Sequence, residues 1–199
     1  VAVVASANEI DSGGSGNLKS SAQILGGTIS GNEANDGAGV LSSAYFYNPY
    51  YLCADTPNVG AAEKPGLFLK NATITNNTAN QDEGYGAGVF AIKMKSPAAA
   101  EIRNCTITKN SAALGGGVAS YGNFTSLTID GCTITGNKAA NYGGGFAAES
   151  NSGEGAGTTI TNTKLCNNTA DKAASDVYLD GSIAKLSAAK DMSEQYLGK

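Results

Sequence analysis

A short motif recurs five times in the sequence, and this repeat restricts the chain to a stacked architecture. The motif is an aliphatic residue, three spacer residues, Thr-Ile-Thr, one variable residue, Asn, another variable residue and Ala. Its copies cover residues 24–34, 69–79, 102–112, 129–139 and 160–170, and the last copy has Lys164-Leu165-Cys166 at the Thr-Ile-Thr position. Internal repeats with periods of roughly 20–50 residues indicate solenoids or similar arrays.

The spacing of the copies indicates the kind of solenoid. The central aliphatic residues are 45, 33, 27 and 31 positions apart: Ile29, Ile74, Ile107, Ile134 and Leu165. A constant motif at unequal spacing predicts a fixed rung that carries loops of variable length. Thr-Ile-Thr alternates with the period of a strand, and the shortest period accommodates three short strands and three turns. The sequence therefore predicts an all-β fold, a single-stranded right-handed parallel β-helix of about six coils.

Stacked rungs assign a role to each repeated position. The central aliphatic residues, and those that begin each copy, are expected to point inward and stack, because one rung cannot bury its aliphatic residues alone whereas stacked rungs bury a continuous column. Four copies lead into a Gly-x-Gly block, which we expect where the chain bends tightly or coil walls approach closely. The Asn of each copy is predicted to form a ladder of amides along one turn, with left-handed dihedrals. The ladder comprises Asn32, Asn77, Asn110, Asn137 and Asn168.

The repeat defines one domain over residues 1–199. Residues 1–23 are assigned to an N-terminal coil or cap, residues 24–180 to the repeat coils, and residues 181–199 to a C-terminal cap or the start of a next module. A short capping helix is predicted within 187–197, with Ser187 as its N-cap.

The absence of histidine and the near absence of arginine exclude several classes of function. The chain has no histidine, which excludes Ser-His-Asp triads and histidine-bound zinc. Its net charge is -4 and Arg103 is the only arginine, so nucleic-acid binding has no electrostatic support. No apolar run has the length of a membrane span. We therefore expect no nucleic-acid partner and no span in this segment, and a monomer.

The repeat resembles a known group of proteins. The succession Ile-x-Asn-x-Thr-Ile-Thr-x-Asn-x-Ala followed by Gly-Gly-Gly-Val is similar to the pectate-lyase-like right-handed β-helix superfamily. More narrowly it resembles the adhesin-type repeats of bacterial surface proteins, such as the polymorphic outer-membrane proteins of chlamydiae. The resemblance covers about residues 20 to 180. It implies an exported bacterial protein, extracellular or on the cell surface, that acts as a non-catalytic adhesin or structural stalk.

Enzymes on the same fold are the alternative. Polygalacturonase-like members have Asn-Thr-Asp, Asp-Asp, Gly-His-Gly and Arg-Ile-Lys blocks, and none of these occurs in the chain. Arg103 has no acidic pair in its rung and is interpreted as a solvated strand residue. A polysaccharide lyase or glycoside hydrolase with an unrecognised carboxylate site remains the second hypothesis, and no catalytic residue is assigned.

One group of carboxylates suggests a metal site. Asp82 and Glu83 are expected in a loop near the loop of Asp36 in the previous coil. Such a group would form either a weak Ca²⁺ site with oxygen ligands or a solvated loop charge, and the second interpretation is preferred. No cofactor is therefore assigned.

Two cysteines share one repeat position. Cys105 and Cys132 should stack in successive coils with parallel side chains. Their Cβ atoms would then be about 4.8 Å apart, beyond the usual range for a disulfide. The sequence predicts two inward thiols that are not linked, and it places Cys166 at an outward Thr position.

The densest candidate for binding is an aromatic insertion after the first Gly-x-Gly-Val strand. Its tyrosines are Tyr45, Tyr47, Tyr50 and Tyr51. Other coils have long loops at the same point, so the same flank should gather Tyr121 and Phe124. Tyrosine stacks on sugar rings and forms contacts with proteins through an apolar ring and a polar hydroxyl. We expect these six residues to contact a glycan or a host surface protein, unless the rings fold back onto the apolar flank.

Overall fold

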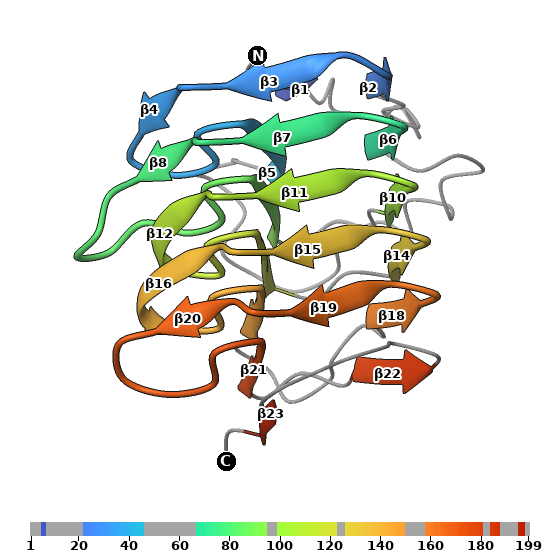
Figure 1. Ribbon diagram of the computed structural model, residues 1–199. Coiled ribbons are helices and arrows are strands. Elements are labelled where there is room, and N and C mark those ends of the chain that lie inside the picture. Colours follow the sequence, from blue (N-terminus) through green and yellow to red (C-terminus); the bar gives the residue numbers. More distant parts are fainter. Residues whose placement is uncertain are drawn as a thin grey trace, which may run out of the picture.

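The protein is a right-handed parallel β-helix in the computed structural model (Figure 1). The structure describes residues 5–6, 22–45, 67–94, 99–122, 126–149, 158–180, 184–187 and 195–197. The chain crosses the front of Figure 1 from right to left in one strand of each coil, returns behind, and begins the next coil one step lower. Every strand pairing in the described part is parallel, as the repeat predicts.

Four sheets form the walls of the solenoid, and each takes one strand from a coil. Sheet A contains seven strands, in the order β1 (Ala5–Ser6), β5 (Val40–Tyr45), β9 (Val89–Met94), β13 (Val118–Gly122), β17 (Phe146–Glu149), β21 (Val177–Asp180) and β23 (Gln195–Leu197). Sheet B contains six, β2 (Ala22–Leu25), β6 (Leu67–Lys70), β10 (Ala99–Arg103), β14 (Ser126–Asp130), β18 (Thr158–Thr161) and β22 (Ala184–Ser187).

The other two sheets have five strands each. Sheet C carries the Thr-Ile-Thr copies and contains β3 (Thr28–Ser30), β7 (Thr73–Thr75), β11 (Thr106–Thr108), β15 (Thr133–Thr135) and β19 (Lys164–Cys166). Sheet D contains β4 (Glu33–Ala34), β8 (Thr78–Ala79), β12 (Ser111–Leu114), β16 (Lys138–Tyr142) and β20 (Thr169–Ala170). The coil thus has four strands where the sequence predicted three, because the residues after each ladder Asn form sheet D.

Three left-handed turns separate the four strands of a coil. The first turn uses Gly26, Asn71, Asn104, Gly131 and Asn162; the second uses Gly31, Asn76, Lys109, Gly136 and Asn167; the third uses Gly37, Gly86, Gly115, Gly143 and Ala174. Glycine and asparagine tolerate positive φ best, which explains why they dominate these columns. The prediction that the ladder asparagines themselves take left-handed dihedrals is wrong, since the residue before each of them does.

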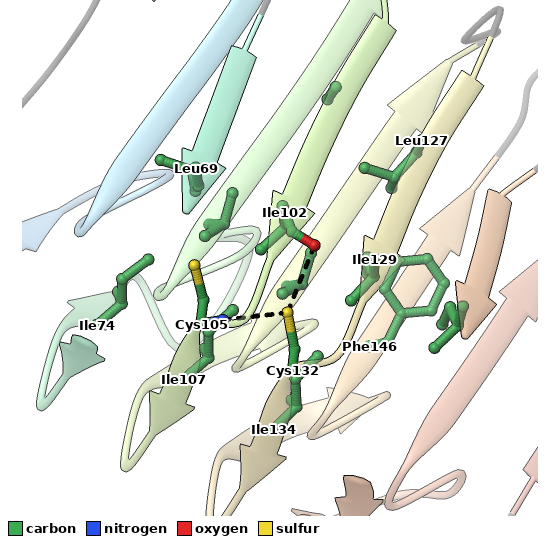
Figure 2. Packing of buried hydrophobic residues seen from close by; sticks show 14 of the residues in the cluster. Leu69, Ile74, Ile102, Cys105, Ile107, Leu127, Ile129, Cys132, Ile134 and Phe146 are labelled. Atoms are coloured by element: carbon green, nitrogen blue, oxygen red, sulfur yellow. Dashed lines mark hydrogen bonds between the residues drawn. The ribbon is translucent and has the colours of Figure 1, made fainter. Parts of the chain in front are cut away.

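The interior is a narrow column of stacked aliphatic side chains. Ile74, Ile107 and Ile134 are in register in sheet C and have no exposed surface. The aliphatic residues of sheet B stack in the same way, and Figure 2 shows the two sets facing each other across the core, with Phe146 of β17 beside them. Each coil contributes few large side chains, so the coils must stack to remove them from water.

The Asn ladder holds the coils together beside this core. The first four ladder residues each donate an Nδ2–H bond to Oδ1 of the Asn in the next coil, and these donor–acceptor distances are 2.8–3.0 Å. The other Nδ2–H of Asn77, Asn110, Asn137 and Asn168 bonds the carbonyl of the central Ile one coil earlier. Asp176, which has no exposed surface, ends the ladder by accepting from Asn168 Nδ2 at 2.9 Å.

Close approach between coils explains the second glycine of each Gly-x-Gly block. A Cβ atom at Gly88 would overlap the carbonyl oxygen of Gly117 and lie 2.9 Å from Ile107 Cγ2. Equivalent overlaps with the next coil occur at Gly39, Gly117 and Gly145. These positions therefore require glycine for space, whereas the first glycine of the block requires it for positive φ.

We expect Gly88→Ala to lower the free energy of unfolding by about 1–3 kcal/mol, the usual cost of overpacking a rigid interior. Chemical denaturation followed by circular dichroism measures the change. Gly136→Asn is the matched control, because Gly136 has open space around it and a φ of 65° that Asn tolerates. Equal stability of the two variants would contradict the close approach between coils.

The end of the chain differs from the sequence prediction. Residues 184–187 and 195–197 are strands that extend sheets B and A, not parts of a capping helix. Residues 188–194 lie outside the described residues. Without a following strand, the edges of β18 and β21 would expose unpaired backbone N–H and C=O groups. The strands β22 and β23 pair with these edges and form hydrogen bonds with those groups. Ser187 accordingly pairs with Thr161 at the end of β22 instead of capping a helix.

Candidate functional site

The predicted aromatic site falls largely outside the described residues. Tyr47, Tyr50, Tyr51 and Phe124 are not described, and Tyr45 is described only as the last backbone position of β5. Tyr121 lies on β13 and is partly exposed on the outer face of sheet A. The hypothesis of an aromatic loop stays a prediction, and Tyr121 locates the flank on which it would lie.

Parallel register arranges the outer face of sheet A in two columns. One contains Phe90, Ala119, Ala147 and Tyr178, and the other contains Ile92, Tyr121, Glu149 and Asp180. We call Tyr85, Phe90, Tyr121, Glu149, Tyr178 and Asp180 the tyrosine–carboxylate surface, since contacts join Tyr85 to three of the others. Tyr85, Tyr121, Glu149 and Asp180 remain partly exposed, so a ligand can reach them.

Tyr85 is the centre of this surface. Its ring stacks on Phe90 with 5.3 Å between centroids and meets the edge of Tyr121 at 5.8 Å. Its hydroxyl donates to Glu149 Oε2 at 2.9 Å, and its backbone N–H donates to Asp36 Oδ1, also at 2.9 Å. Tyr85 precedes β9 and Glu149 ends β17, so one side chain connects coils that are not adjacent in the stack.

A second pair of rings lies near the C-terminal coils. Tyr142 and Tyr178 stack with 4.7 Å between centroids. Lys172 Nζ lies 5.8 Å from the centroid of the Tyr142 ring, within the range of a cation–π contact. The Tyr178 hydroxyl donates to Asp180 Oδ2 at 3.3 Å. Burial and the negative charges of Asp180 and Glu149 raise the pKa of Tyr178 to about 12, so the ring keeps its proton at neutral pH.

The charged form of Glu149 is disfavoured at its place on this surface. Glu149 and Asp180 are register partners in adjacent strands, a separation of about 4.8 Å between backbones. Burial raises the pKa of Glu149, and the charge of Asp180 raises it further, while the hydrogen bond from Tyr85 acts in the opposite direction. Within the described part of the chain neither carboxylate forms an ion pair.

This raised pKa predicts a pH dependence of stability. Folding favours the protonated form of Glu149, so its contribution is present below the ordinary glutamate pKa and is lost as pH rises through the raised value. Glu149→Gln stays uncharged and keeps an acceptor for Tyr85. We expect the variant to gain stability relative to the wild type as pH rises from acid to neutral. Urea denaturation at a series of pH values tests this, and parallel stability curves would contradict it.

The proposed calcium ligands do not form a cluster. Asp36 is partly buried and bonds the Tyr85 N–H, whereas Asp82 and Glu83 are exposed. Among the described residues no group of three or more acidic, cysteine or histidine side chains is placed to hold a metal ion. A calcium site at these three residues therefore has no support from their arrangement.

Arg103 lies in a polar network on sheet B. Its Nε donates to Glu101 Oε2 at 2.8 Å, and Nη1 lies 3.6 Å from Asp130 Oδ2 in the next coil. Its own rung supplies one carboxylate, Glu101, and not the acidic pair of a lyase site, because residues two apart on one strand share a face; the second carboxylate, Asp130, comes from the next coil in register. Its carboxylate partners and half-exposed side chain make it part of a surface ion-pair network.

Cys105 and Cys132 are buried, unlinked thiols stacked in successive coils, as predicted (Figure 2). The N–H of Cys105 donates to Cys132 Sγ at 3.4 Å, and the Cys132 thiol donates to the Ile102 carbonyl at 3.4 Å. Hydrogen bonding to Cys105 and burial raise the pKa of the Cys132 thiol. Cys166 occupies the outward Thr position that the sequence assigns to it, in register with Thr135, and its side chain is buried there.

We expect Cys105 and Cys132 to stay reduced in the purified protein. Their parallel orientation and burial oppose both disulfide formation and access by oxidants. Alkylation under denaturing, non-reducing conditions followed by peptide mass spectrometry should find both thiols modified. A linked Cys105–Cys132 peptide in high yield would contradict this.

Sequence reasoning missed Tyr85, Tyr142 and Tyr178 as site residues. A positional signal exists for two of them. Tyr85, Leu114 and Tyr142 each precede the first glycine of a Gly-x-Gly block and are in register with one another. The left-handed turn that follows leads the chain into the next strand of sheet A. A bulky residue at that position can therefore lie over the small Ala119 and Ala147 of the neighbouring column.

The described part of the chain defines the protein as a parallel β-solenoid with a tyrosine–carboxylate surface on one wall. No protein-family model, curated protein or solved structure matches it. The described residues contain no helix long and apolar enough to cross a bilayer.

Proposed function

We propose that the protein is a non-catalytic binding module, an adhesin or stalk segment of an exported bacterial surface protein. The observation that supports this is the tyrosine–carboxylate surface, which exposes parts of Tyr85, Tyr121, Glu149 and Asp180 on one wall. The repeat's similarity to adhesin-type repeats of the pectate-lyase-like superfamily adds an extracellular or cell-surface location. The ligand would be a glycan or a host surface protein.

The distribution of variable residues favours the outer face of sheet A as the contact surface. The three central strands of sheet C have Thr at both outward positions, because stacking favours identical β-branched neighbours. The outward columns of sheet A instead change from coil to coil in size, charge and aromaticity. Variable side chains on a constant scaffold give a surface its specificity.

Glycan arrays and binding to host-cell surfaces test the proposal. We expect Tyr121→Ala to weaken binding by at least tenfold, about 1.4 kcal/mol, while thermal unfolding changes little, because Tyr121 is partly exposed. Thr106→Ala, on the exposed face of sheet C, is the matched control and should bind normally. Equal binding by both variants would exclude this wall as the contact surface.

The predicted aromatic loop has its own test. We expect the double substitution Tyr47→Ala and Tyr50→Ala to weaken binding at least tenfold, about 1.4 kcal/mol, with nearly unchanged unfolding. A variant that binds normally but melts early would show that the loop is structural.

One observation favours the second candidate, a polysaccharide lyase or glycoside hydrolase. Glu149 and Asp180 are neighbouring carboxylates, one with a raised pKa, and glycosidases use two carboxyl groups about 5–10 Å apart. Release of reducing ends from a panel of polysaccharides, abolished by Glu149→Gln, would establish this activity. Its absence across the panel leaves binding as the function.

A further inference from the structure

Among the described residues, no lysine or arginine forms an ion pair with the carboxylates of the tyrosine–carboxylate surface. Glu149 and Asp180 occupy consecutive positions of one outward column, and the column continues with Tyr121 and Ile92, which are uncharged. The ion pairs of the described residues lie elsewhere, at Arg103 on sheet B and Lys138 on sheet D. Two partly buried carboxylates side by side without a cation favour a partner that supplies one.

The tyrosine rings beside the two carboxylates also favour a cationic partner. The faces of tyrosine rings attract cations. The ammonium group of Lys172 already lies over the ring of Tyr142, which stacks on Tyr178 of sheet A. Tyr85 and Tyr121 border the carboxylates through the hydrogen bond to Glu149 and the edge contact between their rings. A ligand at this place meets apolar ring surface and negative charge within a few ångströms of each other.

We propose that the outer face of sheet A binds a polysaccharide with free amino groups, an amino-sugar polymer that is not fully acetylated. The pyranose rings would lie on Tyr85 and Tyr121, and the ammonium groups would bond Glu149 and Asp180. This inference rests on the binding function proposed above and adds the chemical class of its ligand.

The shape of the surface suits an extended polymer. Its residues come from four successive coils, from Tyr85 before β9 to Asp180 at the end of β21. Strands of adjacent coils are about 4.8 Å apart, so these groups line the wall along the solenoid axis. Successive sugars of a linear chain can therefore contact successive coils. Polyanionic glycans are opposed by the same carboxylates.

Isothermal titration calorimetry with glucosamine oligomers tests the proposal. Three probes of equal length are compared at a pH at which the amines are protonated: the free-amine oligomer, its N-acetylated form and oligogalacturonate. We expect the free-amine oligomer to bind at least tenfold more tightly than the N-acetylated form, and oligogalacturonate not to bind. The double substitution Glu149→Gln and Asp180→Asn should remove this preference, while Glu33→Gln, an exposed carboxylate on sheet D, should leave it intact.

The outcomes separate this inference from the function on which it rests. Equal binding of the free-amine and N-acetylated oligomers would overturn the amino-sugar assignment and keep a glycan-binding module. Binding of an oligolysine peptide as tightly as the free-amine oligomer would overturn the assignment to a sugar. Failure of every oligomer to bind, together with a blank glycan array, would overturn both. Circular dichroism confirms that each variant is folded.

Discussion

Ile107→Asp should abolish the cooperative fold. Ile107 has no exposed surface and stacks between Ile74 and Ile134, so a carboxylate there would meet neither water nor a partner. Burying an unpaired charge costs several kcal/mol, a large part of the roughly 5–15 kcal/mol that stabilises a typical domain. We expect loss of the cooperative thermal transition, measured by circular dichroism and calorimetry.

The neighbouring residue provides the control. Thr106 is exposed on the same strand, and Thr106→Asp should change the melting temperature little. A normal melting curve for Ile107→Asp would show that the register of sheet C is wrong.

Breaking the Asn ladder at its middle should have the second largest effect. Asn110→Ala removes the donor to Asn137 Oδ1 and the donor to the Ile74 carbonyl, and it deprives Asn77 of its acceptor. Each buried polar group left without a partner costs about 1–3 kcal/mol. We expect the free energy of unfolding to fall by about 3 kcal/mol or more, measured by urea denaturation.

Asn76→Gly tests the specificity of that effect. Asn76 is also a turn asparagine, but it is exposed and has a φ of 55°, which glycine adopts readily. Its replacement should be nearly neutral. If the two variants lost equal stability, the turn conformation and not the ladder would be responsible.

Most of the fold could be predicted from the repeat, because each coil of a solenoid packs mainly on the coils before and after it. Once Thr-Ile-Thr is assigned to a strand, the inward position of Ile107, the shared position of Cys105 and Cys132, and the column of Asn110 follow from register alone. Each coil contacts its neighbours along the stack, so no distant partner had to be guessed.

The features that could not be predicted from the sequence depend on how the chain turns from one sheet to the next and on contacts between coils. The short strands of sheet D follow the ladder Asn without an alternating pattern, and the left-handed residue precedes the Asn because the turn must place the amide inward. Tyr85 could not be assigned to Glu149, since its ring crosses a coil to reach it. The ion pairs of Arg103 required the register of two coils on one face.

The ladder of amides also has a direction. Asn77, Asn110 and Asn137 each accept from the coil before and donate to the coil after, so their roles are interchangeable. Asp176 accepts from Asn168 but its carboxylate has no N–H to donate onward. A duplicated or deleted coil between β7 and β19 would therefore restore the same pairing, whereas the coil bearing Asn168 and Asp176 must stay the last coil of the ladder. The length of this solenoid can change by whole coils without any new hydrogen-bond chemistry, provided that its final acceptor is kept.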